Sequence, residues 1–199
     1  MQQDSIDRIC DEWRRELPDL DASPVTVLGR ITRLAGLVRR HVDAALTPYA
    51  IGWDLLDVLG ALRRAGPPFR RTPTALYRAC LLSSGAMTNR LDRLERAGLV
   101  TRMPDPQDRR GILVGLTEQG RAVVEQAVAA GWATQQQLMA TLTPAECETI
   151  AALLRKLVLG LEGPVLAADA PPGASHTPGP QTRRAAKHLR ASRPARDEC

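Results

Sequence analysis

The sequence predicts a mainly helical protein with one small β-hairpin. Apolar residues recur at helical spacing over most of residues 5–161, and four Ser-Pro or Thr-Pro pairs stand where helices would begin. One segment rich in turn residues separates two short apolar runs. A hydroxyl followed by proline favours a helix start, because the hydroxyl accepts a hydrogen bond from a free amide and proline lacks one.

The two ends of the predicted fold are long helices. An N-terminal amphipathic helix ends near Pro18, helices over residues 24–46 and 48–65 follow, and Gly66 ends the third. Near the other end, helices are expected over residues 117–140 and 144–161. The pairs that mark helix starts are Ser23-Pro24, Thr47-Pro48, Thr72-Pro73 and Thr143-Pro144, the last with a capping-box Glu146.

A compact module lies between these helices. Short helices are predicted over residues 73–81 and 84–97, and Gly98 suits a left-handed C-terminal cap. Strands over residues 99–103 and 112–116 flank a turn over residues 105–111. Two short helices followed by a basic hairpin suit a winged helix-turn-helix, in which the second helix enters a DNA major groove.

The helix over residues 84–97 has one apolar stripe, formed by Met87, Leu91 and Leu94. The opposite side combines small residues, which allow close approach to a duplex, with Asn and Arg donors that read base edges. Asp92 opposes phosphate binding or pairs with Arg96, and Arg90 flanks the stripe, where it suits an intramolecular partner or a small anion. The predicted DNA contacts are Ser84, Gly85, Ala86, Thr88, Asn89 and Arg93.

The hairpin turn carries Arg109 and Arg110, which we predict contact DNA. Arginines at a hairpin tip can enter a narrow minor groove, where the negative potential is strongest. Asp108 is expected to brace one of these arginines. The alternative, a merely solvated turn, would seldom combine that acid with two arginines.

The distribution of charge indicates that the wing supplies the affinity for DNA. The net charge is +5, but six basic and three acidic residues beyond residue 163 account for +3, so the body carries only +2. Locally placed charge must therefore attract DNA. Aromatic residues make up 3% of the chain, which argues against binding of stacked single strands or RNA.

Other classes of function find little support. The four cysteines lack metal-ligand spacing, so neither a metal nor a cofactor is predicted, and His41, His176 and His188 form no catalytic motif. We expect a protein that is not an enzyme. The N-terminus does not resemble a signal peptide, and no apolar run reaches the roughly 20 residues of a membrane helix, so a cytoplasmic location is expected.

Four motifs resemble the MarR family of winged-helix repressors, over roughly residues 24–161. This resemblance implies a homodimer held by its terminal helices, which binds a palindromic double-stranded DNA operator and is released by a small molecule or by oxidation. The expected organisation is an extra helix over residues 1–22, the MarR-type domain over residues 23–162 and a disordered basic tail over residues 163–199. The motifs are Ser83-Ser84-Gly85-Ala86-Met87-Thr88-Asn89-Arg90-Leu91, Leu94-Glu95-Arg96-Ala97-Gly98-Leu99-Val100, Asp105-Pro106-Gln107-Asp108-Arg109-Arg110 and Leu116-Thr117-Glu118-Gln119-Gly120.

Within that family the chain is most similar to the urate-responsive regulators. Four ligand-associated positions of that subset match Trp13, Asp54 in a Gly-Trp-Asp-Leu-Leu motif, Arg90 and Arg102. The resemblance implies that an organic anion, urate or a related ligand, binds the arginines and repels Asp54, which tilts the recognition helix. The alternative is that Asp54 and the arginines are structural ion pairs and Trp13 is core.

Two further hypotheses remain. A thiol-oxidation sensor would use Cys10, near which only Arg8 and Arg14 could lower its pKa. A winged-helix interaction scaffold would keep the fold without binding DNA. Removal of the wing charges distinguishes that scaffold from a repressor.

Overall fold

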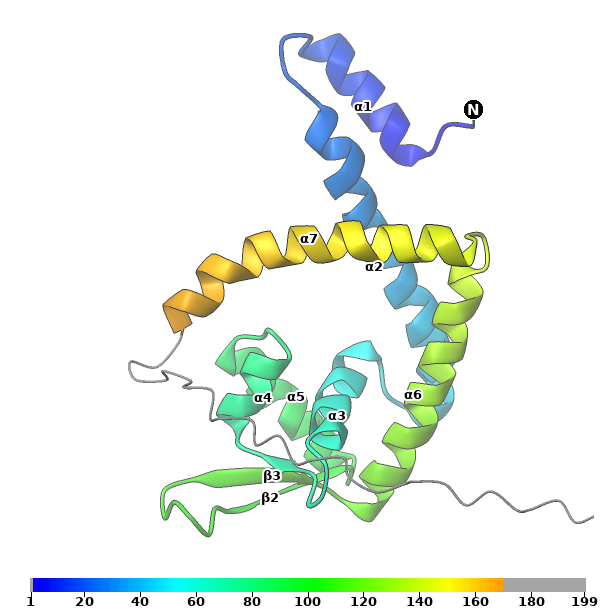
Figure 1. The fold of residues 1–199 in the computed structure, drawn as a ribbon. Coiled ribbons are helices and arrows are strands. Elements are labelled where there is room, and N and C mark those ends of the chain that lie inside the picture. Colours follow the sequence, from blue (N-terminus) through cyan, green and yellow to red (C-terminus); the bar gives the residue numbers. More distant parts are fainter. Residues whose placement is uncertain (1, 170–199) are drawn as a thin grey trace, which may run out of the picture. The chain divides into compact units, whose positions relative to one another are not determined.

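The computed structural model describes residues 2–169, which confirm the predicted mainly helical fold (Figure 1). The chain divides after Cys147 into two units. The elements are α1 (Ser5–Glu16), α2 (Ser23–Leu46), the 3-10 helix η1 (Thr47–Tyr49), α3 (Trp53–Arg64), β1 (Arg70–Arg71), α4 (Pro73–Ala79), α5 (Ser84–Arg96), β2 (Val100–Pro104), β3 (Ile112–Leu116), α6 (Glu118–Met139) and α7 (Pro144–Asp169).

The core of the first unit lies where α3, α4 and α5 meet the sheet and the long helices α2 and α6. The predicted stripe of α5 points into it, and these three side chains are 0–2% exposed. Burial of such side chains supplies the main driving force for folding. The largest fully buried members are Leu46, Leu59, Leu62, Leu76, Met87, Leu91, Leu94, Val42, Val58, Val114 and Val124.

The sheet is antiparallel, with strand order β1-β3-β2. β2 and β3 form the predicted hairpin, in register from Val100 opposite Leu116 to Pro104 opposite Ile112. β1 was not predicted. Its two residues are too few to show a period, and its pairing with β3 depends on contacts over 40 residues away in sequence.

Two of the four hydroxyl-proline pairs cap helices as predicted. The Thr72 hydroxyl accepts from the Ala75 amide at 3.2 Å at the start of α4. Thr143 and Glu146 form the predicted capping box, in which the Glu146 carboxylate accepts from the Thr143 amide at 2.8 Å. The Ser23-Pro24 prediction is wrong in detail: Ser23 is the first helical residue and its hydroxyl donates to Asp21.

The prediction that a helix begins at Thr47-Pro48 is also wrong. That pair forms only the single turn η1, and Ala50 then adopts a left-handed φ of 54°. α3 begins at Trp53, whose amide donates to the Asp43 carboxylate at 2.6 Å. This cap comes from α2, ten residues earlier, so tertiary structure rather than local sequence sets the helix start.

The base of the hairpin is fastened to α6. Gly98 has the predicted left-handed conformation, with a φ of 70°. The Thr117 hydroxyl accepts from the Gly120 amide at 2.9 Å and donates to the Gly98 carbonyl at 2.7 Å. One side chain therefore caps α6 and holds the end of α5.

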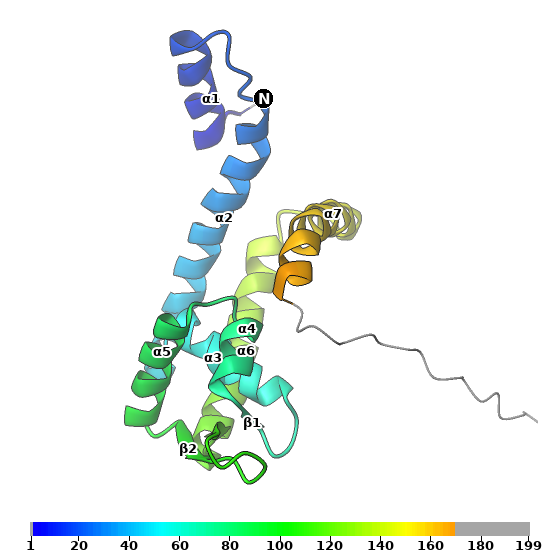
Figure 2. The same cartoon turned by 90° about the vertical axis from the view of Figure 1, so that its left-hand side faces the viewer.

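α1 lies beside the N-terminal part of α2 (Figure 2). Asp4 and Asp7 form the capping box of α1, and both carboxylates pair with Arg30, at 2.8 and 2.6 Å. A hydrogen bond from the Asp7 amide, with help from Arg30, lowers the pKa of Asp4 below 3.8. Ile6 packs against Gly29 and Cys10 is also buried, so α1 docks through an apolar face and one ionic cluster.

α7 continues to Asp169, beyond the predicted end near residue 161. Proline usually breaks a helix partly by crowding the residue before it, and here that residue is Gly163, which has no β-carbon. The predicted tail boundary at residue 163 therefore falls within this helix, and residues 170–199 of the predicted tail lie outside the described residues. Among the helices of residues 2–169, none is long and apolar enough to cross a membrane.

Candidate DNA-binding interface

α5 presents most of the predicted contact residues. The Ser83 hydroxyl caps the helix by accepting from the Ala86 amide at 3.3 Å, and burial of the apolar stripe fixes which side faces outward. The turn from α4 to α5 closes through a hydrogen bond from the Leu82 amide to the Tyr77 carbonyl. Ala86 is half-buried, and the exposed residues of this face are Ser84, Gly85, Thr88 and Asn89.

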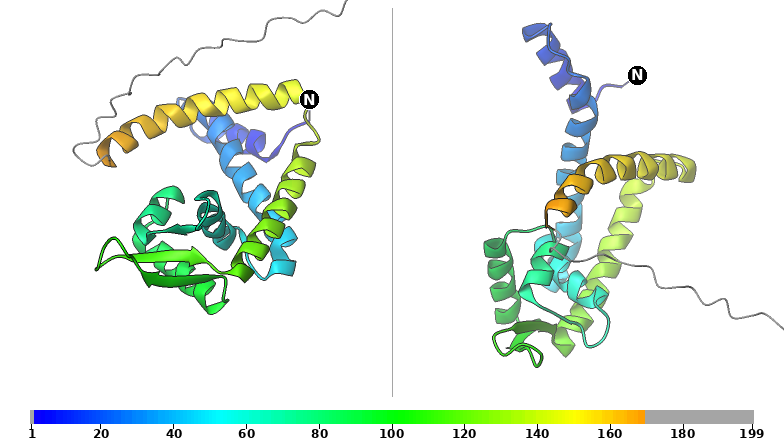
Figure 3. Two further views of the ribbon diagram at one scale, coloured as in Figure 1. Left: turned by 60° about the horizontal axis from the view of Figure 1, so that its bottom comes forward. Right: turned by 60° about the vertical axis from the view of Figure 1, so that its left-hand side comes forward.

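The hairpin of β2 and β3 projects beyond the lobe (Figure 3). Its tip carries Arg109 and Arg110, which are exposed and form no ion pair with any residue of the described range 2–169. Asp108 contacts the main chain of Arg110 rather than forming an ion pair with its guanidinium. Its carboxylate accepts from the Arg110 main-chain amide at 3.0 Å, because a short Asp side chain reaches the amide two residues on.

Arg93 does not project freely from α5 as predicted. Its Nη1 atom lies 2.7 Å from Oδ2 of Asp54, in the first turn of α3. Arg90, one turn earlier, donates to the Asp54 carbonyl at 3.1 Å. The two arginines point toward α3 because residues three apart share a helix face. Arg90 thus lies beside Asp54, but it contacts the main-chain carbonyl, and the carboxylate pairs with Arg93 instead.

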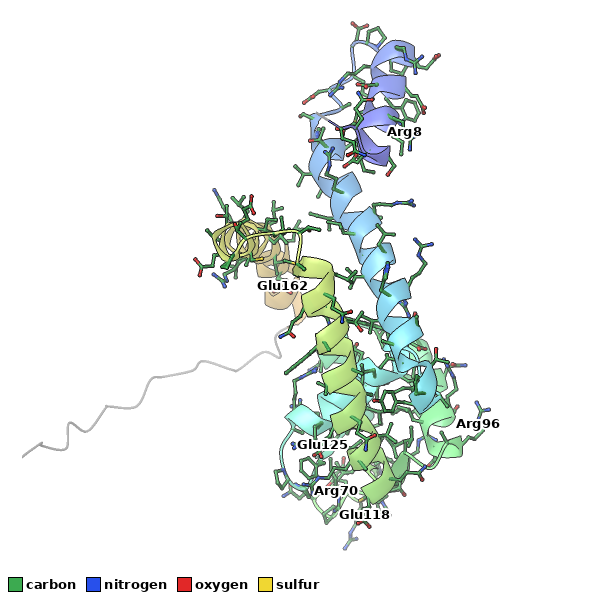
Figure 4. All side chains as sticks on the ribbon, turned by 90° about the vertical axis from the view of Figure 1, so that its right-hand side faces the viewer. Arg8, Arg70, Arg96, Glu118, Glu125 and Glu162 are labelled. Carbon is green, nitrogen blue, oxygen red and sulfur yellow. The ribbon has the colours of Figure 1, made fainter. Side chains whose placement is uncertain are left out.

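Arg102 belongs to a different cluster. From β2 it pairs with Asp92 at 2.6 Å and with Glu95, both on α5, and these contacts raise its pKa, Asp92 most strongly. The prediction that Asp92 pairs with Arg96 is wrong, because Arg96 donates only to the Asp92 carbonyl. The Arg96 side chain projects from the lobe (Figure 4). Arg102 thus joins the wing to the recognition helix rather than to Asp54.

Trp13 lies far from both clusters within one chain. Its side chain is 51% exposed on α1, so it is not core. α1 docks at Arg30, and the helix from there to Leu46 spans about 24 Å at 1.5 Å per residue. The four residues of the urate-responsive pattern therefore occupy three separate places in one chain.

A cavity of about 120 Å³ between α3 and α6 was missed by sequence reasoning. Two glycines, Gly60 on α3 and Gly131 on α6, line this space and are a signal that the sequence offers for it. The cavity walls combine indole rings with one carboxylate and one guanidinium. The lining residues are Trp53, Leu56, Asp57, Gly60, Arg64, Val128, Gly131, Trp132 and Gln135.

Two of the described cysteines, Cys10 and Cys80, lie in environments that disfavour oxidation. Cys10 is only 1% exposed. Burial raises the pKa of the Cys80 thiol to about 11, and the charge of Asp57 adds to the rise. A buried thiol or a protonated one reacts slowly with oxidants. Within residues 2–169, no group of three or more metal-ligating side chains is gathered.

A helix-turn-helix followed by a basic antiparallel hairpin defines a winged-helix DNA-binding protein. A model of the MarR family matches residues 56–111. The regulator PecS of Dickeya dadantii is 32% identical over 152 residues, which are 76% of this chain and 92% of PecS. The chain belongs to the MarR family of transcriptional regulators, and its relatives are regulators rather than enzymes.

Solved structures agree with this assignment. A MarR variant from E. coli complexed with operator DNA is 33% identical, with a TM-score of 0.61 over 73% of this chain and 96% of that one. BpsR of Bordetella bronchiseptica, described in a study of how 6-hydroxynicotinic acid regulates its DNA binding, is 28% identical. Its TM-score is 0.60, over 66% of this chain and 92% of BpsR.

Proposed function

We propose that this protein is a repressor that binds a palindromic operator as a homodimer and is released by a small organic anion. The observation that carries the DNA site is the pair of wing arginines, exposed and without ionic partners in residues 2–169, beside the exposed small and polar residues of α5. The first helical residues of α5 would approach base edges, and the wing would contact the backbone or minor groove.

The experiment replaces Arg109 and Arg110 by Ala and measures operator affinity at several salt concentrations. We expect about tenfold weaker binding and a salt slope smaller by about 2, since each lost phosphate contact lowers the slope by about 1. The matched control replaces Arg8 and Arg15 on α1, which removes equal charge outside the lobe. Equal affinities for the parent and the wing variant would contradict the wing contact, and absence of operator binding by the parent would favour the scaffold hypothesis.

A planar organic anion suits the charges around α3 and α5. The DNA binding of the relative BpsR is regulated by 6-hydroxynicotinic acid, a small aromatic carboxylic acid, which supports an effector of the urate or hydroxynicotinate kind. Arg90 beside Asp54, Arg102 and Trp13 are the candidates from the urate-responsive pattern. Since Trp13 does not reach the others within one chain, a site with all four residues requires a second protomer.

The cavity between α3 and α6 offers another place for the same effector. Trp53 and Trp132 provide apolar surfaces, and the Arg64 guanidinium would pair with an anion. We would measure thermal stabilisation and operator release with urate, xanthine, hypoxanthine and 6-hydroxynicotinate. Loss of the response in Arg64→Ala would place the effector in the cavity, and loss in Arg90→Ala or Arg102→Ala would place it at α5. No response in the parent would contradict the proposal.

Oxidation of Cys10 receives less support from the geometry. Cys10 is 1% exposed and lies on the face of α1 that packs against α2, so its sulfur is poorly accessible to peroxide. If organic anions fail, operator release by peroxide in the parent and in Cys10→Ser tests this alternative.

A further inference from the structure

Arg93 forms an ion pair with Asp54, although its guanidinium is also a group that DNA would attract. Arg93 leaves α5 close to the exposed Asn89, one turn away, and its side chain is 44% exposed. Asp54 is 21% exposed, so the pair lies at the edge of the lobe rather than in its core. An edge guanidinium can leave one carboxylate for another anion without burying charge.

The position of Asp54 on α3 favours a carboxylate independently of Arg93. It lies in the first turn of α3, where the helix dipole favours a carboxylate. A β-carbon built at Gly52 would lie 3.1 Å from its Oδ1 atom and 3.2 Å from Oδ1 of Asp43. Two carboxylates therefore converge beside Gly52. Asp43 has its own partners, the Trp53 amide and Arg39, whereas the Asp54 carboxylate pairs with Arg93.

We propose that Asp54 competes with DNA for Arg93 and so acts as a built-in limit on operator affinity. In the free protein the Arg93 guanidinium binds Asp54, and in the complex it binds a phosphate or base edge. When Arg93 leaves, the Asp54 and Asp43 charges are less compensated. Part of the binding free energy that the new contact with DNA supplies is therefore lost. This inference rests on the proposed role of α5 in DNA binding.

The direct test is Asp54→Asn, which keeps the shape of the side chain and removes its charge. We expect operator affinity to rise about two- to fivefold, as fits loss of an exposed ion pair. The salt slope should steepen by up to about 1, because removal of the Asp54 charge leaves the interface with one more uncompensated positive charge. Asp11→Asn, an exposed carboxylate on α1, is the control for the change in net charge.

A double-mutant cycle separates competition from simple charge removal. In an Arg93→Ala background, Asp54→Asn should change affinity by less than half of its effect in the parent. An equal gain in both backgrounds would show that Asp54 repels DNA directly and would overturn the proposal. An unchanged or weaker affinity in Asp54→Asn alone would also overturn it, because Asp54 would then be neutral or would position Arg93.

A measurement on the unmodified protein guards against a variant that folds poorly. Side-chain NMR signals of Arg93, assigned through Arg93→Lys, should change on addition of operator DNA as the guanidinium exchanges a carboxylate for a nucleic-acid partner. Unchanged signals in the bound state would overturn the proposal. If the wing variant Arg109→Ala with Arg110→Ala also binds normally, the DNA interface itself is wrong. If only Asp54→Asn has no effect, only the competition is wrong.

Discussion

The backbone of Gly120 on α6 packs directly against the carbonyl of Leu99, immediately before β2. A β-carbon at Gly120 would lie 1.9 Å from that oxygen, and the same carbonyl accepts from the Thr117 amide at 3.1 Å. The Leu-Thr-Glu-Gln-Gly motif therefore has a structural role: its Thr caps α6, and its Gly allows α6 to pack closely against the base of the wing.

Gly120→Ala is expected to destabilise the fold by about 3 kcal/mol, because the backbone of Leu99 must move. Gly36→Ala is the matched control: it lies within α2, and its new methyl group meets no atom within 4 Å. That change should stabilise by about 0.5–1 kcal/mol through helix propensity. Urea unfolding of both variants checks that the free energy of unfolding falls in Gly120→Ala and rises in Gly36→Ala. Equal stabilities would contradict the close contact.

Arg102→Ala should loosen the wing. Asp92 and Glu95 would lose the cation that ties α5 to β2, so we expect faster amide exchange over residues 100–116 and several-fold weaker operator binding. Arg96→Ala is the control, since Arg96 contacts only a main-chain carbonyl of α5. If exchange stays slow and only the effector response is lost, Arg102 is an effector ligand rather than a brace.

The helices before Leu46 and after Thr117 are expected to hold an obligate homodimer. On α7 the exposed apolar residues recur every three or four positions, and Leu153, Leu157 and Leu161 are 42–71% exposed. A stripe of this kind usually marks an interface. Leu157→Asp should weaken the dimer in sedimentation experiments, and Arg155→Asp, also on α7, should not. A stable folded monomer of the parent at micromolar concentration would contradict the expectation.

The thiol of Cys80 should stay protonated at neutral pH. With a pKa of about 11, about one thiol in a thousand is ionised at pH 8. The folded state keeps this proton while the unfolded chain releases it near pH 9, so the contribution to stability is complete below pH 9 and is lost as the pH rises through about 11. Mass spectrometry after iodoacetamide treatment should show slow labelling of Cys80 at pH 8 and rapid labelling above pH 10. Labelling at pH 8 as fast as in the urea-unfolded chain would contradict the shift.

The sequence by itself determined the helices, the hairpin, the buried stripe of α5 and the exposed wing arginines. These features follow from short-range rules: helical period, capping at Thr72, Thr117 and Thr143, and turn chemistry. Such rules act within about four residues, so each stretch of sequence contains the information for its own local structure. The family motifs added the order of the elements.

Only the tertiary structure decided the ionic partners and the remaining boundaries. Arg93 and Arg102 stand on neighbouring elements of one lobe, yet one binds Asp54 and the other binds Asp92 and Glu95. α3 begins at Trp53 because an acid on α2 caps it, and β1 exists because β3 lies beside it. A long flexible side chain or a single edge strand pairs with the group that packing brings close to it. No local sequence pattern encodes the distance between two such groups in the folded chain.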